Sequence, residues 1–270
     1  MSETIHFEKD TESVLDYSTR AEQRAGKGKY LTLPVISGEV LLIIAVLVGL
    51  FMFYQLKYTG VVSAKEQDQA LESLQESWEN GTTVAGEEVP GDATAILRVS
   101  KFDGGKDFPV LFGVDQSILA KAPGIYPATQ QFGEKGNTAL AAHRDGWNAP
   151  FSDIDALETC DVIEVETRSS VYTYKVPSSA DESDRRMNEN SQCFNNQQAK
   201  TLNNETYGSM MGHSIVQPDQ VDVIWPVPGV ERSEDNASLS VLTMTSCHPH
   251  WSNEQRYIVH AVNTEIKRKR

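Results

Sequence analysis

The longest apolar run in the chain lies near its start, from Val40 to Tyr54, and it extends through Ile36 and Leu56. About 20 such residues at 1.5 Å rise each can cross the hydrocarbon layer as a helix. The run therefore predicts one transmembrane helix over residues 35–58. A cleaved signal peptide ending near Val62-Ser63-Ala64 is the alternative, but the leader in front of the apolar run is too long for that pattern.

The charges on either side of this run predict its direction. Four basic residues precede it closely, whereas only two follow it: Arg20, Arg24, Lys27 and Lys29 before, Lys57 and Lys65 after. Because positive residues stay on the cytoplasmic side, we expect a cytoplasmic tail over residues 1–34 and an external remainder from about residue 59.

The pattern changes twice after the apolar run. Lys65–Glu79 has apolar residues at spacings of three and four among strong helix formers, which predicts a short amphipathic helix. Gly81–Gly91 is acidic and contains Pro90, as in a flexible spacer. We expect residues 59–91 to form an extracellular stalk that holds a domain away from the membrane.

From Thr94 onward, short apolar runs alternate with turn residues, and little helical pattern lies between them. This spacing predicts an all-β barrel or sandwich over residues 92–265. The eight expected strands are Ala95–Val99, Val110–Val114, Asn137–Ala142, Asp161–Glu166, Val171–Val176, Val221–Trp225, Leu239–Thr245 and Arg256–Val262. The segment Ser178–Gly212 is rich in Asn, Ser, Gln and charge, and is expected to be a long surface excursion between strands.

Composition narrows the function classes. The chain has 24 basic and 38 acidic residues, a net charge of −14, and this excess of carboxylates argues against binding nucleic acid. Three cysteines are an odd number, so at least one thiol cannot pair within the chain.

The segment Val241–Ala261 carries the strongest chemical signal. It places Cys247 at the end of one predicted strand and Arg256 at the start of the next. If these strands pair antiparallel, the thiol and the guanidinium meet at one end of the sheet. A second small-residue strand leads directly into His143, and histidine is well suited to move a proton at neutral pH.

Taken singly, each of these residues has an ordinary structural explanation, and two other classes of protein stay open. Cys247, His248, His250 and His260 are close in sequence and could hold zinc. Three N-glycosylation triplets would suit a receptor ectodomain without catalysis; they begin at Asn80, Asn204 and Asn236.

Taken together, the segments resemble the sortases, cysteine transpeptidases of Gram-positive bacteria. That family has a TLxTC motif, onto which Thr243, Ser246 and Cys247 fall, with Met244 in place of Leu and Ser246 in place of the second Thr. Arg256 lies 256 − 247 = 9 residues after Cys247, and His143 lies 247 − 143 = 104 residues before it. The membrane entry and Pro226-Val227-Pro228-Gly229 are most similar to the class E sortases of actinobacteria.

The resemblance implies a fold and a division of labour. The fold would be a closed eight-stranded β-barrel with short helices, preceded by one transmembrane helix. Cys247 would be the nucleophile, His143 the general acid and base, and Arg256 the stabiliser of the oxyanion and substrate, with Thr245 and Ser246 contacting the substrate. No metal or other cofactor is implied.

The same resemblance implies the partners and the location. The substrates would be surface proteins with a C-terminal Leu-Pro-X-Thr-Gly or Leu-Ala-X-Thr-Gly signal. The acceptor would be an amine of a lipid-linked wall precursor or a pilin lysine. The protein would be a single-pass protein of the cell membrane with an external catalytic domain, and the excursion over 178–212 would bear on peptide preference.

Two features stay open at this point. Cys160 and Cys193 could form a disulfide in an oxidising exterior or remain two thiols, and their spacing does not decide between these. The basic tail, residues 266–270, includes four consecutive cations, expected to be solvated or to contact an anionic polymer or lipid.

Overall fold

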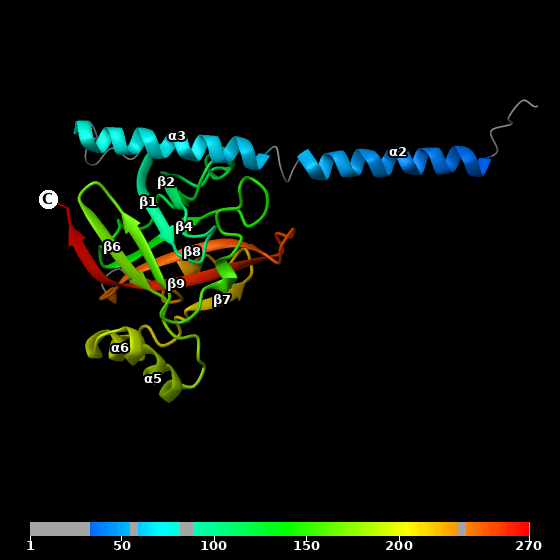
Figure 1. Cartoon of the computed structure of the whole chain (residues 1–270). Helices are drawn as coiled ribbons and strands as arrows, with labels where there is room; N and C mark the ends of the chain where they lie inside the picture. The colour runs from blue at the N-terminus through cyan, green and yellow to red at the C-terminus, as the bar shows by residue number, and fades with distance from the viewer. Residues whose placement is uncertain (1–32, 55–58, 82–88, 232–235, 270) are drawn as a thin grey trace, which may run out of the picture. The chain divides into compact units, whose positions relative to one another are not determined.

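The computed structural model describes residues 33–54, 59–81, 89–231 and 236–269 (Figure 1). The chain divides into two compact units between Phe51 and Met52. The first unit contains all but the last two residues of helix α2, Leu33–Phe53. Among the residues that the structure describes, no helix combines the length and the apolar character that a membrane crossing requires. The predicted cytoplasmic tail up to residue 32 lies outside the described residues, as does the predicted helix end over 55–58.

The second unit is built on a closed eight-stranded β-barrel, as predicted. Neighbouring strands follow the order β6-β5-β1-β2-β3-β4-β8-β9, and a pairing between β6 and β9 closes the ring. These strands are β1 Ala93–Val99, β2 Asp107–Phe112, β3 Gly124–Ile125, β4 Gly136–Ala141, β5 Val162–Glu166, β6 Ser170–Lys175, β8 Ser240–His248 and β9 Gln255–Arg268. A further strand, β7 His213–Val216, pairs with the first half of β9.

The barrel interior is a single apolar core to which nearly every strand contributes. Leu97, Val110, Leu140, Leu242 and Val259 are all fully or almost fully buried in it. Because side chains alternate across a strand, the apolar residues that gave the short runs in the sequence face inward together.

The predicted set of strands needs three corrections. Val221–Trp225 is not a strand, because Val221–Ile224 is a 3-10 helix, η3. The side-chain Nδ2 of Asn137 donates to the carbonyls of Val223 and Trp225. The two strands that the prediction omits, β3 and β7, span only two and four residues, too few for alternation to be visible. Strand β9 continues to Arg268, so most of the predicted basic tail over 266–270 belongs to the barrel.

Helix α3, Thr59–Asn80, covers one side of the barrel and contains the predicted amphipathic helix (Figure 1). Ser63 Oγ donates to the Ala120 carbonyl at 2.7 Å, and Gln67 Nε2 donates to the Lys121 carbonyl at 2.8 Å. Leu74 is buried beneath the helix, and Lys269 Nζ lies 4.2 Å from the Trp78 ring centre. The helical part of the predicted stalk, residues 59–91, is therefore packed against the barrel and does not hold it at a distance.

The excursion over 178–212 folds into two helices, α5 Ser183–Cys193 and α6 Asn196–Leu202, at the far side of the barrel from α3 (Figure 1). It has its own small core, in which Phe194, Leu202 and Tyr207 pack with Val241 and Val262 of the barrel. The segment is thus an excursion between β6 and β7, as expected, and it is helical with a core of its own. Its few apolar residues pack in this small core against the barrel, and polar residues make up the rest of both helices.

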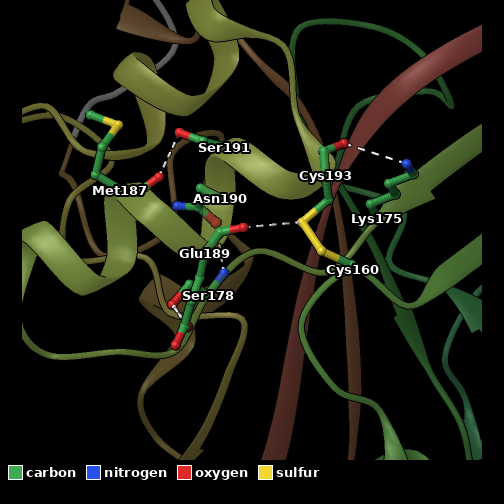
Figure 2. Close-up of a disulfide and its surroundings, with 8 residues drawn as sticks. All are labelled: Cys160, Lys175, Ser178, Met187, Glu189, Asn190, Ser191 and Cys193. Carbon is green, nitrogen blue, oxygen red and sulfur yellow. Dashed lines mark hydrogen bonds between the residues drawn. A yellow bond between two sulfur atoms is a disulfide. The ribbon is translucent and has the colours of Figure 1, made fainter.

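A disulfide joins the excursion to the barrel. Cys160, in the turn before β5, is bonded to Cys193 at the end of α5, with 5.4 Å between their Cα atoms (Figure 2). Lys175 Nζ also donates to the Cys193 carbonyl, and the Ser178 amide donates to Asn190 Oδ1 at 2.8 Å. The sequence left the pairing open, and the structure answers it.

We predict that replacing both Cys160 and Cys193 by serine lowers the free energy of unfolding by about 2–4 kcal/mol, because the bridge closes a loop of 33 residues in the unfolded chain. Urea unfolding measures the loss. The control is reductant, which should destabilise the wild type by a similar amount and leave the double variant unchanged. Equal stability of the oxidised wild type and the variant would contradict the prediction.

Candidate active site

A pocket of about 480 Å³ lies at the barrel end where β4 and β8 terminate. Its walls come from the end of β8 and from two loops, the one that follows β4 and the one that joins β8 to β9. The lining residues are His143, Arg144, Asp145, Cys247, Trp251, Ser252, Asn253 and Glu254. Two of the three predicted catalytic residues, Cys247 and His143, therefore share one cavity.

Strand pairing puts Cys247 and Arg256 opposite each other, as the sequence predicted. β8 and β9 are antiparallel, and their register pairs Cys247 with Arg256. Cys247 is a free cysteine and is half-buried, so its sulfur can be reached from the pocket. A thiol at the end of a buried strand is held in place by the backbone ladder that precedes it.

His143 reaches the same level through a parallel pairing. β4 runs parallel to β8 with Ala141 beside Thr245, and two residues further along each strand lie His143 and Cys247. The Phe151 amide donates to the His143 carbonyl at 3.1 Å and fixes the backbone there. One pair of adjacent strands thus brings together His143 and Cys247, which are about a hundred residues apart in sequence.

The surroundings of His143 favour its neutral form. Burial lowers its pKa below the ordinary 6.5, and the Asp145 carboxylate partly offsets this by raising the pKa. Gln116 Nε2 donates to His143 Nε2 at 3.2 Å, and the imidazole stacks on Trp147 with ring centres 6.4 Å apart. In this arrangement Nε2 accepts and the ring proton is on Nδ1.

Arg256 is tied to its own loop. Its Nη1 donates to the carbonyls of Asn253 and Gln255, both at 2.9 Å. In the described part of the chain Arg256 is not among the residues that line the pocket. The strand register nevertheless keeps its backbone opposite Cys247, which does line the pocket.

Thr245 and Ser246, predicted to contact the substrate, face β4. Ser246 Oγ donates to the Ala142 carbonyl at 2.8 Å, and Thr245 Oγ1 donates to the Leu140 carbonyl at 3.2 Å. Both side chains are buried, and neither lines the pocket as described. Their hydroxyls hold β8 against β4.

Asp145 connects the two loops of the pocket. One carboxylate oxygen lies 2.7 Å from His250 Nδ1, and the other accepts from the Trp251 amide at 2.8 Å. Trp251 is 67 % exposed and has a φ of 62°, a backbone conformation that few residues other than glycine adopt. The loop after Cys247 is therefore held in a strained shape by the loop after His143.

The histidines proposed as zinc ligands have separate partners. His248 Nδ1 bonds to Arg144, His250 Nδ1 to Asp145, and His260 Nδ1 to Thr243 Oγ1. His260 is buried on β9 beside Thr243, away from Cys247 in the register. The sequence cluster is thus dispersed in the fold.

Sequence reasoning missed several residues of the site. Gln116 and Trp147 contact His143, yet nothing in their sequence context marks them. Arg144 and Asp145 follow His143 directly, and a charged pair after a buried strand was the one available signal.

Comparison with known proteins identifies the family. The Sortase domain family matches residues 97–264. Sortase SrtE2 of Streptomyces coelicolor is 27% identical over 263 residues, which cover 93% of this chain and 90% of SrtE2. Sortase SrtE1 of the same organism is 27% identical over 230 residues, 82% of this chain but only 54% of SrtE1, so the chain spans about half the length of that relative.

Solved structures agree. The SrtF sortase from Corynebacterium diphtheriae is 35% identical with a TM-score of 0.65, covering 70% of this chain and 92% of that one. The SrtA sortase from Actinomyces oris is 28% identical with a TM-score of 0.50, covering 69% and 87%. The predicted similarity to class E sortases is confirmed by the match to SrtE1 and SrtE2, and the chain belongs to the sortase family.

Proposed function

We propose that this sortase cleaves a C-terminal sorting signal between Thr and Gly and transfers the acyl group to an amine. The observation that carries the proposal is the meeting of Cys247 and His143 in one pocket, with Arg256 opposite Cys247 in the strand register. A thiol beside an imidazole is the arrangement that covalent acyl transfer needs.

The chemistry follows from these three groups. The Cys247 proton passes to His143, and the sulfur attacks the Thr carbonyl carbon. The C–S bond forms and the C–N bond to Gly breaks, while His143 delivers the proton to the departing amine. The acceptor amine then attacks the thioester: the new C–N bond forms, the C–S bond breaks, and His143 passes the proton of the amine to the Cys247 sulfur. Arg256 stabilises the oxyanion in both steps. This cycle requires no metal or other cofactor.

The sorting signal and the acceptor belong to the same proposal. The similarity to class E sortases supports a Leu-Ala-X-Thr-Gly signal, with Leu-Pro-X-Thr-Gly as the general form. Two carboxylates, those of Asp145 and Glu254, are among the residues that line the pocket beside the cation Arg144, and a carboxylate suits an incoming amine. A lipid-linked wall precursor or a pilin lysine supplies such an amine.

The test is a fluorogenic sorting peptide incubated with and without an amine acceptor, with the transfer product identified by mass. Cys247→Ala should abolish cleavage and transfer. Arg256→Ala should slow them by hundreds-fold, because loss of an oxyanion donor costs about 2.7–4 kcal/mol. Arg185→Ala, an exposed arginine paired with Glu189 on α5, is the matched control and should keep full activity. Transfer by Cys247→Ala at the wild-type rate would contradict the proposal.

The lowered pKa of His143 predicts the acid side of the pH profile. Activity falls at pH values where the His143 imidazole of the Cys247–His143 pair takes up an extra proton. The acid limb of kcat/KM should therefore lie below pH 6.5. Asp145→Asn removes the charge that raises this pKa and should move the limb to still lower pH, whereas exposed Asp219→Asn should not. A limb above pH 6.5, or one that Asp145→Asn moves upward, would count against this assignment.

We further propose that residues 35–58 anchor the enzyme in the cell membrane with residues 1–34 in the cytoplasm. The support is the apolar sequence from Ile36 to Leu56 and the cations before it. The full chain should stay with membranes after alkaline carbonate washing, and external protease should digest the catalytic domain. A chain that starts at Thr59 is the control and should be released. Release of the full chain by carbonate would refute the anchor.

A further inference from the structure

Arg144 is a buried cation beside the proposed catalytic residues, and the mechanism above gives it no part. Its side chain is only 1% exposed. Its Nη2 lies 2.5 Å from Asp155 Oδ2, its Nη1 donates to His248 Nδ1 at 2.8 Å, and its guanidinium carbon lies 5.5 Å from the Tyr257 ring centre. One planar group thus contacts an acid, an imidazole and an aromatic face.

These contacts have one thing in common. Arg144 is the chain neighbour of His143, His248 is the neighbour of Cys247, and Tyr257 is the neighbour of Arg256. The residues next to all three proposed catalytic groups therefore meet at one guanidinium. Strand pairing fixes the backbones of β4, β8 and β9 up to this level, but His143 lies beyond the last paired residue of β4.

Stability is a poor explanation for this arrangement. Removing a charge from water costs several kcal/mol, and a buried ion pair is often replaced by apolar residues without loss. Asp155 is 46% exposed, so it offsets that cost incompletely, and Arg144 Nε has no hydrogen-bond partner within the described residues. A rigid fork of donors, however, fixes the angle between two partners in a way that an apolar side chain does not.

The geometry points to Arg144 as a positioning residue for the transfer reaction: it sets the mutual orientation of the His143, Cys247 and Arg256 segments through His248, Asp155 and Tyr257. This inference rests on the proposed function. It also fixes a tautomer. A guanidinium only donates, so His248 Nδ1 is the acceptor and the ring proton of His248 is on Nε2.

The experiment compares Arg144→Met, Arg144→Lys and the wild type in the sorting-peptide assay. Arg144→Met should lower kcat by about 10- to 100-fold, as expected when reacting groups shift by an ångström or less. KM for the peptide should change by less than about 3-fold, because Arg144 contacts no substrate group in this scheme. Arg144→Lys should fall between the two, since one ammonium does not span His248 and Asp155 with fixed geometry.

A matched control separates positioning from stability. Arg98 on β1 is also paired with two carboxylates, those of Asp107 and Glu166, away from the pocket, although its side chain is 32% exposed. Arg98→Met should lower the melting temperature and leave kcat unchanged. An unchanged kcat in Arg144→Met, a loss confined to KM, or an equal loss of kcat in Arg98→Met would overturn the inference.

Two further measurements keep the inference testable. If Arg144→Met does not fold, Asp155→Asn removes a partly exposed partner and should still lower kcat; an unchanged kcat would overturn the inference. Side-chain ¹⁵N spectra should show His248 protonated on Nε2 in the wild type and as mixed tautomers in Arg144→Met, which removes the donor; protonation on Nδ1 in the wild type would also overturn it. An inactive wild type would refute the proposed function, and the spectra would still decide the Arg144 contact.

Discussion

The register between β4, β8 and β9 is the constraint on which the site depends. β8 is paired in parallel with β4 and antiparallel with β9. His143, Cys247 and Arg256 therefore reach the same end of the barrel. A slip of one residue on either side would turn the Cys247 side chain to the opposite face of the sheet. Backbone pairing therefore decides where these three residues lie.

A buried polar network fixes that register from the middle of the strands. Thr243 Oγ1 donates to Asn137 Oδ1 at 2.8 Å and lies 2.8 Å from His260 Nδ1, so one hydroxyl links β4, β8 and β9. Burial lowers the pKa of His260 to about 4, and the imidazole stays neutral and able to donate to Thr243 at neutral pH. Another register would break these bonds and leave buried polar groups unsatisfied, which makes it costly.

The sequence was sufficient for this part of the molecule and insufficient for the rest, for physical reasons. Cys247 and Arg256 flank one turn, so local pattern alone predicted that they meet. β3 was missed because two residues carry no periodicity, and Val221–Trp225 was mistaken for a strand because its valines resemble one while its backbone bonds to Asn137. Gln116 and the orientation of Arg144 depend on contacts between segments far apart in sequence, and no local pattern encodes those.

The insertion between β6 and β8 completes the support of the site rather than standing apart from it. It leaves the barrel beside the Cys160–Cys193 bridge and returns as β7, which pairs with β9 so that Val216 lies beside Arg256. His213 on β7 also stacks on Tyr257, with ring centres 6.2 Å apart, on a ring that Arg144 contacts as well. At Arg256, β9 pairs with both β8 and β7, so the first residues of β9 are held from two sides. The disulfide ties the insertion to the barrel at one end, and at the other end β7 pairs with the strand that carries Arg256.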